Sequence, residues 1–241
     1  MTRLTTVGDP EAAAERAARQ IVLILEDAIA RRGVAHLSLA GGGTPRRAYE
    51  LLPNLFEDWD RVELWYGDER CVAPTDEQSN HQLIAGSLLA AIKGAPPLEH
   101  RIQGELGPEE AARIYAEELS KRVPADPGDV MPVLDLALLG LGEDGHTASL
   151  FPGNPAARDT AEAICLPVHN APKPPPERVT MSLPLLRAAR HCLLLATGAG
   201  KTDALAAVLS GPDPHVPASL LGSGRLYIVV DDAASPVSRD S

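Results

Sequence analysis

The chain has 241 residues, of which 44% are hydrophobic and only 3% aromatic, so its core must be built chiefly from aliphatic side chains. The formal net charge of −11, from 22 Lys and Arg against 33 Asp and Glu, disfavours nucleic acid and anionic membranes as partners. Three cysteines without CxxC spacing indicate neither a disulfide framework nor a zinc site, and no apolar run is long enough to span a bilayer, so we expect a cytoplasmic protein.

The first predicted helix begins at Asp9, a typical N-cap followed by Pro10, and ends at Gly33. Short apolar runs then alternate with helical patterns. Strands are expected at 36–40, 62–66, 134–141, 164–168, 179–183, 192–197 and 226–230, and helices at 78–93, 108–122 and 201–209. This alternation predicts a single α/β domain over residues 1–241, with a doubly wound, mostly parallel sheet of Rossmann-like topology. Its core is expected at 10–235, followed by a short disordered tail at 235–241.

A glycine-rich loop follows the first of these strands, in the segment SLAGGGTPRRAYELL. Thr44 is a candidate N-cap and Pro45 the first helical position, so the loop has the strand, glycine turn and helix start of a phosphate site. Arg46 and Arg47 lie in the first turn, where the helix dipole disfavours cations unless an anion is bound. A tight turn with two solvated arginines is the alternative. The loop lacks the GxGxxG spacing, which disfavours NAD.

Polar residues also follow the strand at 62–66. Asp68, Glu69 and Arg70 come directly after it, and Ser79 and Asn80 begin the next predicted helix. These residues either face a ligand at the strand end or form an ordinary surface ion-pair cluster and helix start.

The strand at 134–141 runs into GEDGHTASLFP, which places Asp144 and His146 at the carboxyl end of a buried strand, where open α/β sheets bind ligands. A histidine can take a proton from water near neutral pH, and a nearby carboxylate can orient its ring. Asp144 has a competing interpretation as the N-cap of a short helix at 145–151. The chain has no GxSxG, HExxH or EF-hand pattern, so we expect acid–base chemistry without a metal or a serine nucleophile.

A second candidate anion loop is ATGAGKTDALAAVL, in which Lys201 opens a helix after Gly198 and Gly200. It is similar to the end of a Walker A loop, but Leu195 stands where the full pattern needs glycine. A single phosphate beside Lys201 therefore fits better than a nucleoside triphosphate. The alternative is a glycine turn with a surface lysine.

Taken in order, the motifs AGGGTP, GDER followed by SN, LLGLGEDGHTASLFP, PKPPPERVT and GAGK resemble those of the 6-phosphogluconolactonase family. The resemblance covers nearly the whole chain, and GEDGHTASLFP is its most specific part. This family shares a superfamily with glucosamine-6-phosphate isomerase/deaminases, which carry Asp-Glu-Tyr where this chain has Asp68-Glu69-Arg70. The chain departs from the family in its last strand, 226–230, which lacks a tryptophan that is often present.

The resemblance implies a cofactor-free hydrolase that converts 6-phosphoglucono-1,5-lactone to 6-phosphogluconate in the oxidative pentose phosphate pathway. His146 would be the general base, with Asp144 beside it. The substrate and its phosphate would be held by Gly42, Gly43, Thr44, Arg46, Asp68, Arg70, Asn80, Lys173, Arg178 and Lys201.

The nearest competing function is that of an amino-sugar-phosphate isomerase/deaminase, in which Asp68 would remove a substrate C–H proton. A non-catalytic sugar-phosphate sensor is disfavoured, because no helix-turn-helix precedes the sheet. We expect a monomer or small homo-oligomer whose partner is the small phosphorylated lactone.

Overall fold

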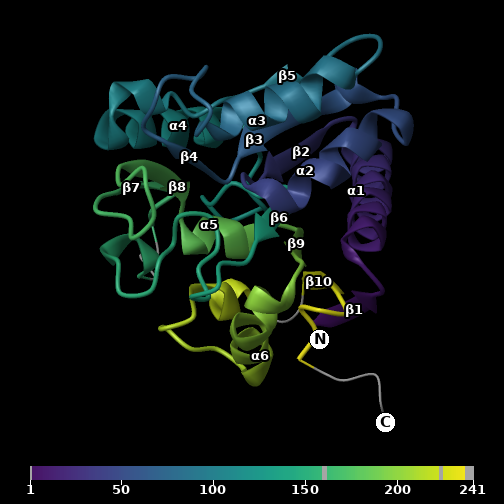
Figure 1. Ribbon diagram of the computed structural model, residues 1–241. Coiled ribbons are helices and arrows are strands. Elements are labelled where there is room, and N and C mark those ends of the chain that lie inside the picture. The colour runs from purple at the N-terminus through teal and green to yellow at the C-terminus, as the bar shows by residue number, and fades with distance from the viewer. Residues whose placement is uncertain (1, 159–161, 223–224, 237–241) are drawn as a thin grey trace.

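The computed structural model describes residues 2–158, 162–222 and 225–236. Its main feature is a seven-stranded sheet in the order β1-β10-β9-β6-β2-β3-β5, in which every neighbouring pair is parallel (Figure 1). The strands are β1 (Arg3–Val7), β2 (Ala35–Leu39), β3 (Val62–Tyr66), β5 (Leu98–Glu99), β6 (Leu136–Gly140), β9 (His191–Ala196) and β10 (Leu226–Asp231). The expected doubly wound, mostly parallel α/β fold is confirmed.

A second, three-stranded antiparallel sheet lies beside the first, in the order β4-β8-β7. Its strands are β4 (Asp68–Arg70), β8 (Arg178–Met181) and β7 (Cys165–Val168). Two strands expected in the parallel sheet, at 164–168 and 179–183, belong here, because an apolar run does not specify which strand it pairs with. The register places Arg70 opposite Arg178 and Asp68 opposite Thr180, which brings two distant motifs together.

Among the described residues, six α-helices cover the sheets: α1 (Pro10–Arg32), α2 (Gly43–Leu51), α3 (Asn80–Ser87), α4 (Pro108–Arg122), α5 (Leu183–Ala188) and α6 (Thr202–Ser210). Short 3₁₀ turns occur at Leu52–Asn54, Trp59–Arg61, Leu89–Ala91, Gly104–Leu106, Pro155–Ala157, Ala199–Lys201 and Pro217–Leu221. In the described part of the chain, none of the helices combines the length and apolarity that crossing a bilayer requires.

Helix α1 begins and ends where the sequence predicts. The Asp9 side chain accepts a hydrogen bond of 2.8 Å from the backbone N–H of Ala12, and Gly33 ends the helix with a φ of 83°. One face of the helix, including Ala17, Ile21 and Leu25, is fully buried. Through this face α1 packs against β2 and β10, next to α2 (Figure 1).

Two predicted local features are wrong. Helix α2 starts at Gly43 with Gly42 as its N-cap, so Thr44 does not cap it; Gly42 has a φ of 91°, which favours glycine. No helix forms over 145–151, where the chain makes turns instead, so Asp144 is not a helix N-cap. The tail expected at 235–241 lies, from residue 237 on, outside the described residues.

The order of the strands determines where a ligand can bind. After β2 the chain continues to β3 on one side of the sheet, whereas after β6 it continues within the central sheet to β9 on the other. Because β2 and β6 are neighbours, their outgoing loops separate and leave a crevice at the carboxyl ends of the two strands. This crevice is the topological switch point of the fold.

The opposite end of the sheet is held by a buried carboxylate. Asp135, which is 2% exposed and precedes β6, accepts a hydrogen bond of 2.8 Å from the backbone N–H of His36 and one of 2.5 Å from Arg32 at the end of α1. The Arg190 Nε, just before β9, lies 3.6 Å from the same carboxylate. Asp135 therefore connects α1, β2, β6 and β9.

We predict that Asp135→Asn lowers the free energy of unfolding by about 2–3 kcal/mol, because it leaves two arginines without their shared buried counter-charge. The matched control is Asp27→Asn, which breaks an exposed pair with Arg31 and should cost less than about 0.5 kcal/mol. Urea denaturation of the two variants measures both values. Equal losses of unfolding free energy in the two variants would show that the burial of Asp135 does not add to its contribution to stability.

Candidate active site

A cavity of about 320 Å³ occupies the switch point. Nine predicted site residues line it: Gly42, Gly43, Thr44, Asp68, Arg70, His146, Lys173, Arg178 and Lys201. Of the remaining three, Asp144 lies behind His146 and Asn80 lies behind Asp68, whereas Arg46 is exposed on α2 and is not part of the lining. Five motifs that are distant in the sequence thus meet at one cavity.

His146 and Asp144 form a dyad in the loop after β6. The His146 Nδ1 is hydrogen-bonded to Asp144 Oδ1, which also accepts the backbone N–H of His146 at 3.3 Å. The loop is closed by Gly142, whose backbone N–H donates to the carbonyl oxygen of His146 at 2.8 Å. No partner for His146 Nε2 occurs among the described residues, so this nitrogen remains available to a ligand or a water.

The surroundings of the dyad favour a neutral imidazole. Burial lowers the pKa of His146 below its ordinary value, and the Lys173 ammonium lowers it further, against the raising effect of Asp144. Although burial raises the pKa of Asp144, its hydrogen bond and charge interaction with His146 bring the net pKa below the usual range. An ionised Asp144 accepts the Nδ1 proton, which leaves Nε2 as the proton acceptor.

Gly142 is needed because the dyad lies against its backbone. A Cβ atom at this position would overlap His146 Nδ1 and would lie 2.5 Å from Asp144 Oδ1. The backbone of Gly142 does not require a positive φ, so the restriction comes from the dyad itself. Sequence reasoning treated this glycine only as part of a loop, because nothing in the local pattern indicates a close approach.

Asp68 is held at the cavity wall by two hydrogen bonds. Its Oδ2 accepts from the Ser149 hydroxyl at 2.6 Å, and its Oδ1 accepts from the Asn80 amide at 3.1 Å. Asp68 and Glu69 are 6% and 3% exposed, so they do not form a surface ion-pair cluster. Sequence reasoning missed Ser149, whose position in GEDGHTASLFP indicates nothing about a partner on β4.

Glu69 organises the start of α3 and the backbone of Arg70. Its carboxylate accepts hydrogen bonds from the backbone N–H groups of Arg70, Asn80 and His81 and from the Ser79 hydroxyl. Burial raises the pKa of Glu69, and these donors act in the opposite direction. The side chain of Asn80 fills the space in front of Gly41, where an added Cβ would overlap it.

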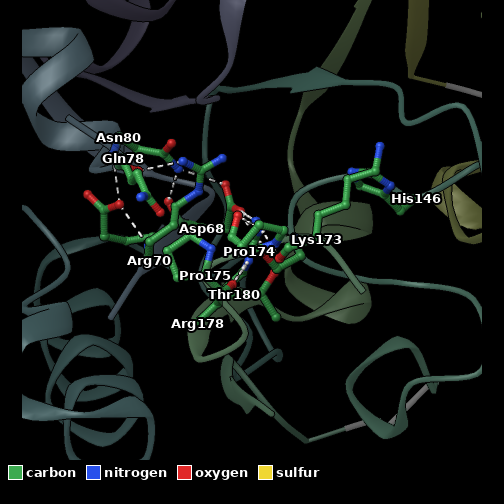
Figure 2. Close-up of polar contacts among 12 residues, drawn as sticks. Asp68, Arg70, Gln78, Asn80, His146, Lys173, Pro174, Pro175, Arg178 and Thr180 are labelled. Carbon is green, nitrogen blue, oxygen red and sulfur yellow. Dashed lines mark hydrogen bonds and ion pairs between the residues drawn. The ribbon is translucent and has the colours of Figure 1, made fainter. Parts of the chain in front are cut away.

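Arg70 and Lys201 supply positive charge to the cavity. One terminal nitrogen of Arg70 donates to the carbonyl oxygen of Gln78 (Figure 2), whereas its buried Nε has no partner among the described residues. Lys201 lines the same cavity as the Gly41–Gly43 loop, as the two-loop arrangement requires. Arg47 instead pairs with Glu11 of α1, at 2.7 Å, and with Glu50.

Within the described ranges, no three His, Cys, Asp or Glu side chains form a metal-ligand group.

Comparison with known proteins places the chain in a family. Residues 8–229 match the family model described as glucosamine-6-phosphate isomerases/6-phosphogluconolactonase. The chain is similar to the 6-phosphogluconolactonase of Streptomyces coelicolor, with 37% identity covering 94% of this chain and 91% of that protein. It also matches the structure of 6-phosphogluconolactonase from Trypanosoma brucei, with a TM-score of 0.84, 28% identity and 97% of both chains covered. A monomeric glucosamine-6-phosphate deaminase, at 23% identity and a TM-score of 0.79, shares the fold.

We predict that Gly142→Ala retains the fold but separates His146 from Asp144, because the new methyl group needs the space of their hydrogen bond. Since Asp144 raises the pKa of His146, the imidazole in the variant should titrate at lower pH than in the wild type. NMR titration of the His146 ring measures this change. Gly86→Ala, in open space on α3, is the control and should leave the titration unchanged, and an unchanged titration in Gly142→Ala would contradict the prediction.

Proposed function

This chain belongs to the glucosamine-6-phosphate isomerase/6-phosphogluconolactonase family, and we propose that it hydrolyses 6-phospho-D-glucono-1,5-lactone to 6-phospho-D-gluconate in the oxidative pentose phosphate pathway. The observation that carries the proposal is the Asp144–His146 dyad, whose Nε2 atom is available at a cavity that is also lined by the Gly42–Thr44 loop and by Lys201. Such a histidine can activate water for attack on a carbonyl carbon.

The phosphate of the substrate would bind between the Gly42–Thr44 loop and Lys201. Helix α2 begins in this loop and has no side-chain cap, so its first backbone N–H groups are available to an anion. No hydrogen bond or ion pair of Lys201 Nζ occurs in the described part of the chain, which leaves its charge for the ligand. Binding the remote phosphate would hold the lactone carbonyl in place beside His146. Arg46 stays a predicted phosphate contact, although its side chain is exposed outside the cavity lining.

The proposed reaction begins when Nε2 of His146 takes a proton from a water whose oxygen attacks C1 of the lactone. The Arg70 guanidinium, with its unpaired Nε, would stabilise the oxygen that becomes negative. The bond from C1 to the ring oxygen then breaks, and the imidazolium returns its proton to that oxygen. The new carboxylic acid loses its proton to solvent, so lactone and water become a carboxylate, a hydroxyl group and one proton.

The competing isomerase/deaminase reaction needs Asp68 as a base. Both oxygens of Asp68 already accept hydrogen bonds, from Ser149 and Asn80, whereas His146 Nε2 accepts none among the described residues. This difference supports lactone hydrolysis.

We also propose that the enzyme acts in the cytoplasm as a single α/β domain, as a monomer or small homo-oligomer, and without a metal or cofactor. The acidic composition, with a formal net charge of −11, supports a small-molecule substrate over nucleic acid.

We predict that the purified protein accelerates acid release from freshly prepared 6-phosphoglucono-1,5-lactone above the spontaneous rate, and that it releases no ammonia from glucosamine 6-phosphate. A pH-stat assay measures the first reaction, and a coupled glutamate dehydrogenase assay measures the second. Ammonia release without lactone hydrolysis would replace the proposed function by the competing one.

We predict that His146→Gln lowers kcat by about 10²–10⁴-fold while the fold is retained, because the general base is lost. Since the pKa of His146 lies below the ordinary histidine value, the acid limb of wild-type kcat/KM should also lie below that value. The control is His215→Gln, which changes an exposed histidine outside the cavity. If His146→Gln retained the wild-type rate, another group would have to be the base.

A further inference from the structure

Arg178 holds the segment 173–175 by three consecutive carbonyl groups. Its Nε donates to the carbonyl oxygen of Pro175 at 2.9 Å, and one terminal nitrogen donates to those of Lys173 and Pro174 at 2.8 and 3.3 Å (Figure 2). The other terminal nitrogen lies 3.5 Å from the Ser149 hydroxyl. The Arg178 side chain is 5% exposed, so movement of this segment would deprive a buried cation of three carbonyl acceptors and leave it only the Ser149 hydroxyl and the Asp68 carboxylate, which lies 4.0 Å away.

The Lys173 side chain extends from this anchored backbone across the cavity toward His146, as Figure 2 shows. Both residues line the cavity, and the charge of Lys173 acts on the His146 ring. In the described part of the chain the Lys173 ammonium forms no ion pair with a carboxylate. A cation that is directed into a cavity without a protein counter-charge is suited to an oxygen of a ligand.

We propose that Lys173 is a further catalytic residue, whose ammonium group contacts the carbonyl oxygen of the bound lactone beside His146, and that Arg178 is the positioning residue that holds it there. This inference rests on the proposed lactone hydrolysis. The water activated by His146 must attack C1, so the carbonyl oxygen bonded to C1 lies close to the imidazole. Lys173 lies on that side of the cavity and supplies a second cation, in addition to Arg70.

The same ammonium affects the protonation of His146. The charged groups that act on the imidazole are Asp144 from its own loop, Asp68 from β4 and Lys173 from the proline-rich segment. Burial is the largest cause that lowers the pKa of His146; Lys173 adds to it, and the two carboxylates oppose it. Loss of the Lys173 charge would therefore make the ring easier to protonate.

During the reaction, C1 gains a bond to the water oxygen and the carbonyl π electrons move to the carbonyl oxygen, which the Lys173 ammonium stabilises without transferring a proton. When the bond to the ring oxygen breaks, those electrons return to form the carboxyl group. The proton taken by His146 goes to the ring oxygen. Lys173 keeps its charge throughout and finally pairs with the carboxylate product.

The test compares Lys173→Met with Lys173→Arg in the full-length protein. Lys173→Met should lower kcat by about 10²-fold, with a smaller change in KM, and should move the acid limb of kcat/KM to higher pH. Lys173→Arg keeps the charge, so the acid limb should stay in place and part of the rate should return. The control Lys93→Met, at an exposed lysine outside the cavity, should match the wild type. A Lys173→Met rate within twofold of the wild type would overturn the proposal.

The positioning role is tested with Arg178→Lys, which keeps a cation but cannot bond three carbonyl groups. It should lower kcat and move the acid limb in the same direction as Lys173→Met. The double variant Lys173→Met, Arg178→Lys should be little slower than Lys173→Met alone, because both changes remove the same interaction. Fully additive losses would contradict the positioning role. If Arg178→Lys does not fold, judged by circular dichroism, the Lys173 variants alone decide the proposal.

Failure of this inference can be distinguished from failure of the proposed function. An active wild type with an equally active Lys173→Met variant would overturn only the role of Lys173. If the wild type did not hydrolyse the lactone, NMR titration of the His146 ring in the wild type and in Lys173→Met would still test whether the Lys173 charge acts on that ring. The ring should titrate at higher pH in Lys173→Met, and an unchanged titration would overturn the inference.

Discussion

The site depends on the divergence of the loops that leave β2 and β6. The two strands are parallel neighbours, but the chain continues from them toward opposite sides of the sheet, so their carboxyl ends are not covered by one crossing connection. The glycine loop leaves from β2 and the dyad loop from β6, so both border the same cavity. The proposed phosphate loop and the proposed base thus reach one cavity from two neighbouring strands.

A crevice between two strands is narrow, and the loops around it leave little room for side chains. The dyad lies directly against Gly142, and the Asn80 amide lies directly against Gly41, so neither position can accept a Cβ without displacing one of these side chains. Gly145, with a φ of 82°, turns the dyad loop back while its neighbour Val216 supports it. These glycines provide space at the points where backbone and polar side chains meet.

Buried charge gives the cavity its rigidity. Glu69 and Asp68 on β4 and Arg178 on β8 are all almost inaccessible to solvent, and each has several hydrogen-bond partners that offset its loss of hydration. Through these contacts the antiparallel sheet fixes the start of α3 and the proline-rich segment relative to the switch point. The polar groups that face the substrate in our proposal are therefore in place before it binds, which lowers the reorganisation that catalysis requires.

The sequence alone determined the features that depend on neighbouring residues: the caps of α1, the strands β2, β3, β6, β9 and β10, the two glycine loops, and His146 at the end of a buried strand. The edge strands β1 and β5 of the parallel sheet were not predicted. It also indicated the family, because the motifs occur in a characteristic order. Only the tertiary structure decided that β4, β7 and β8 form a separate antiparallel sheet, that Asp68 and Glu69 are buried, and that Asp144 pairs with His146 instead of capping a helix. The physical reason is that periodicity and capping act over a few residues, whereas strand partners and burial arise from contacts between segments far apart in the chain. The hydrogen bond between Ser149 and Asp68 is such a contact.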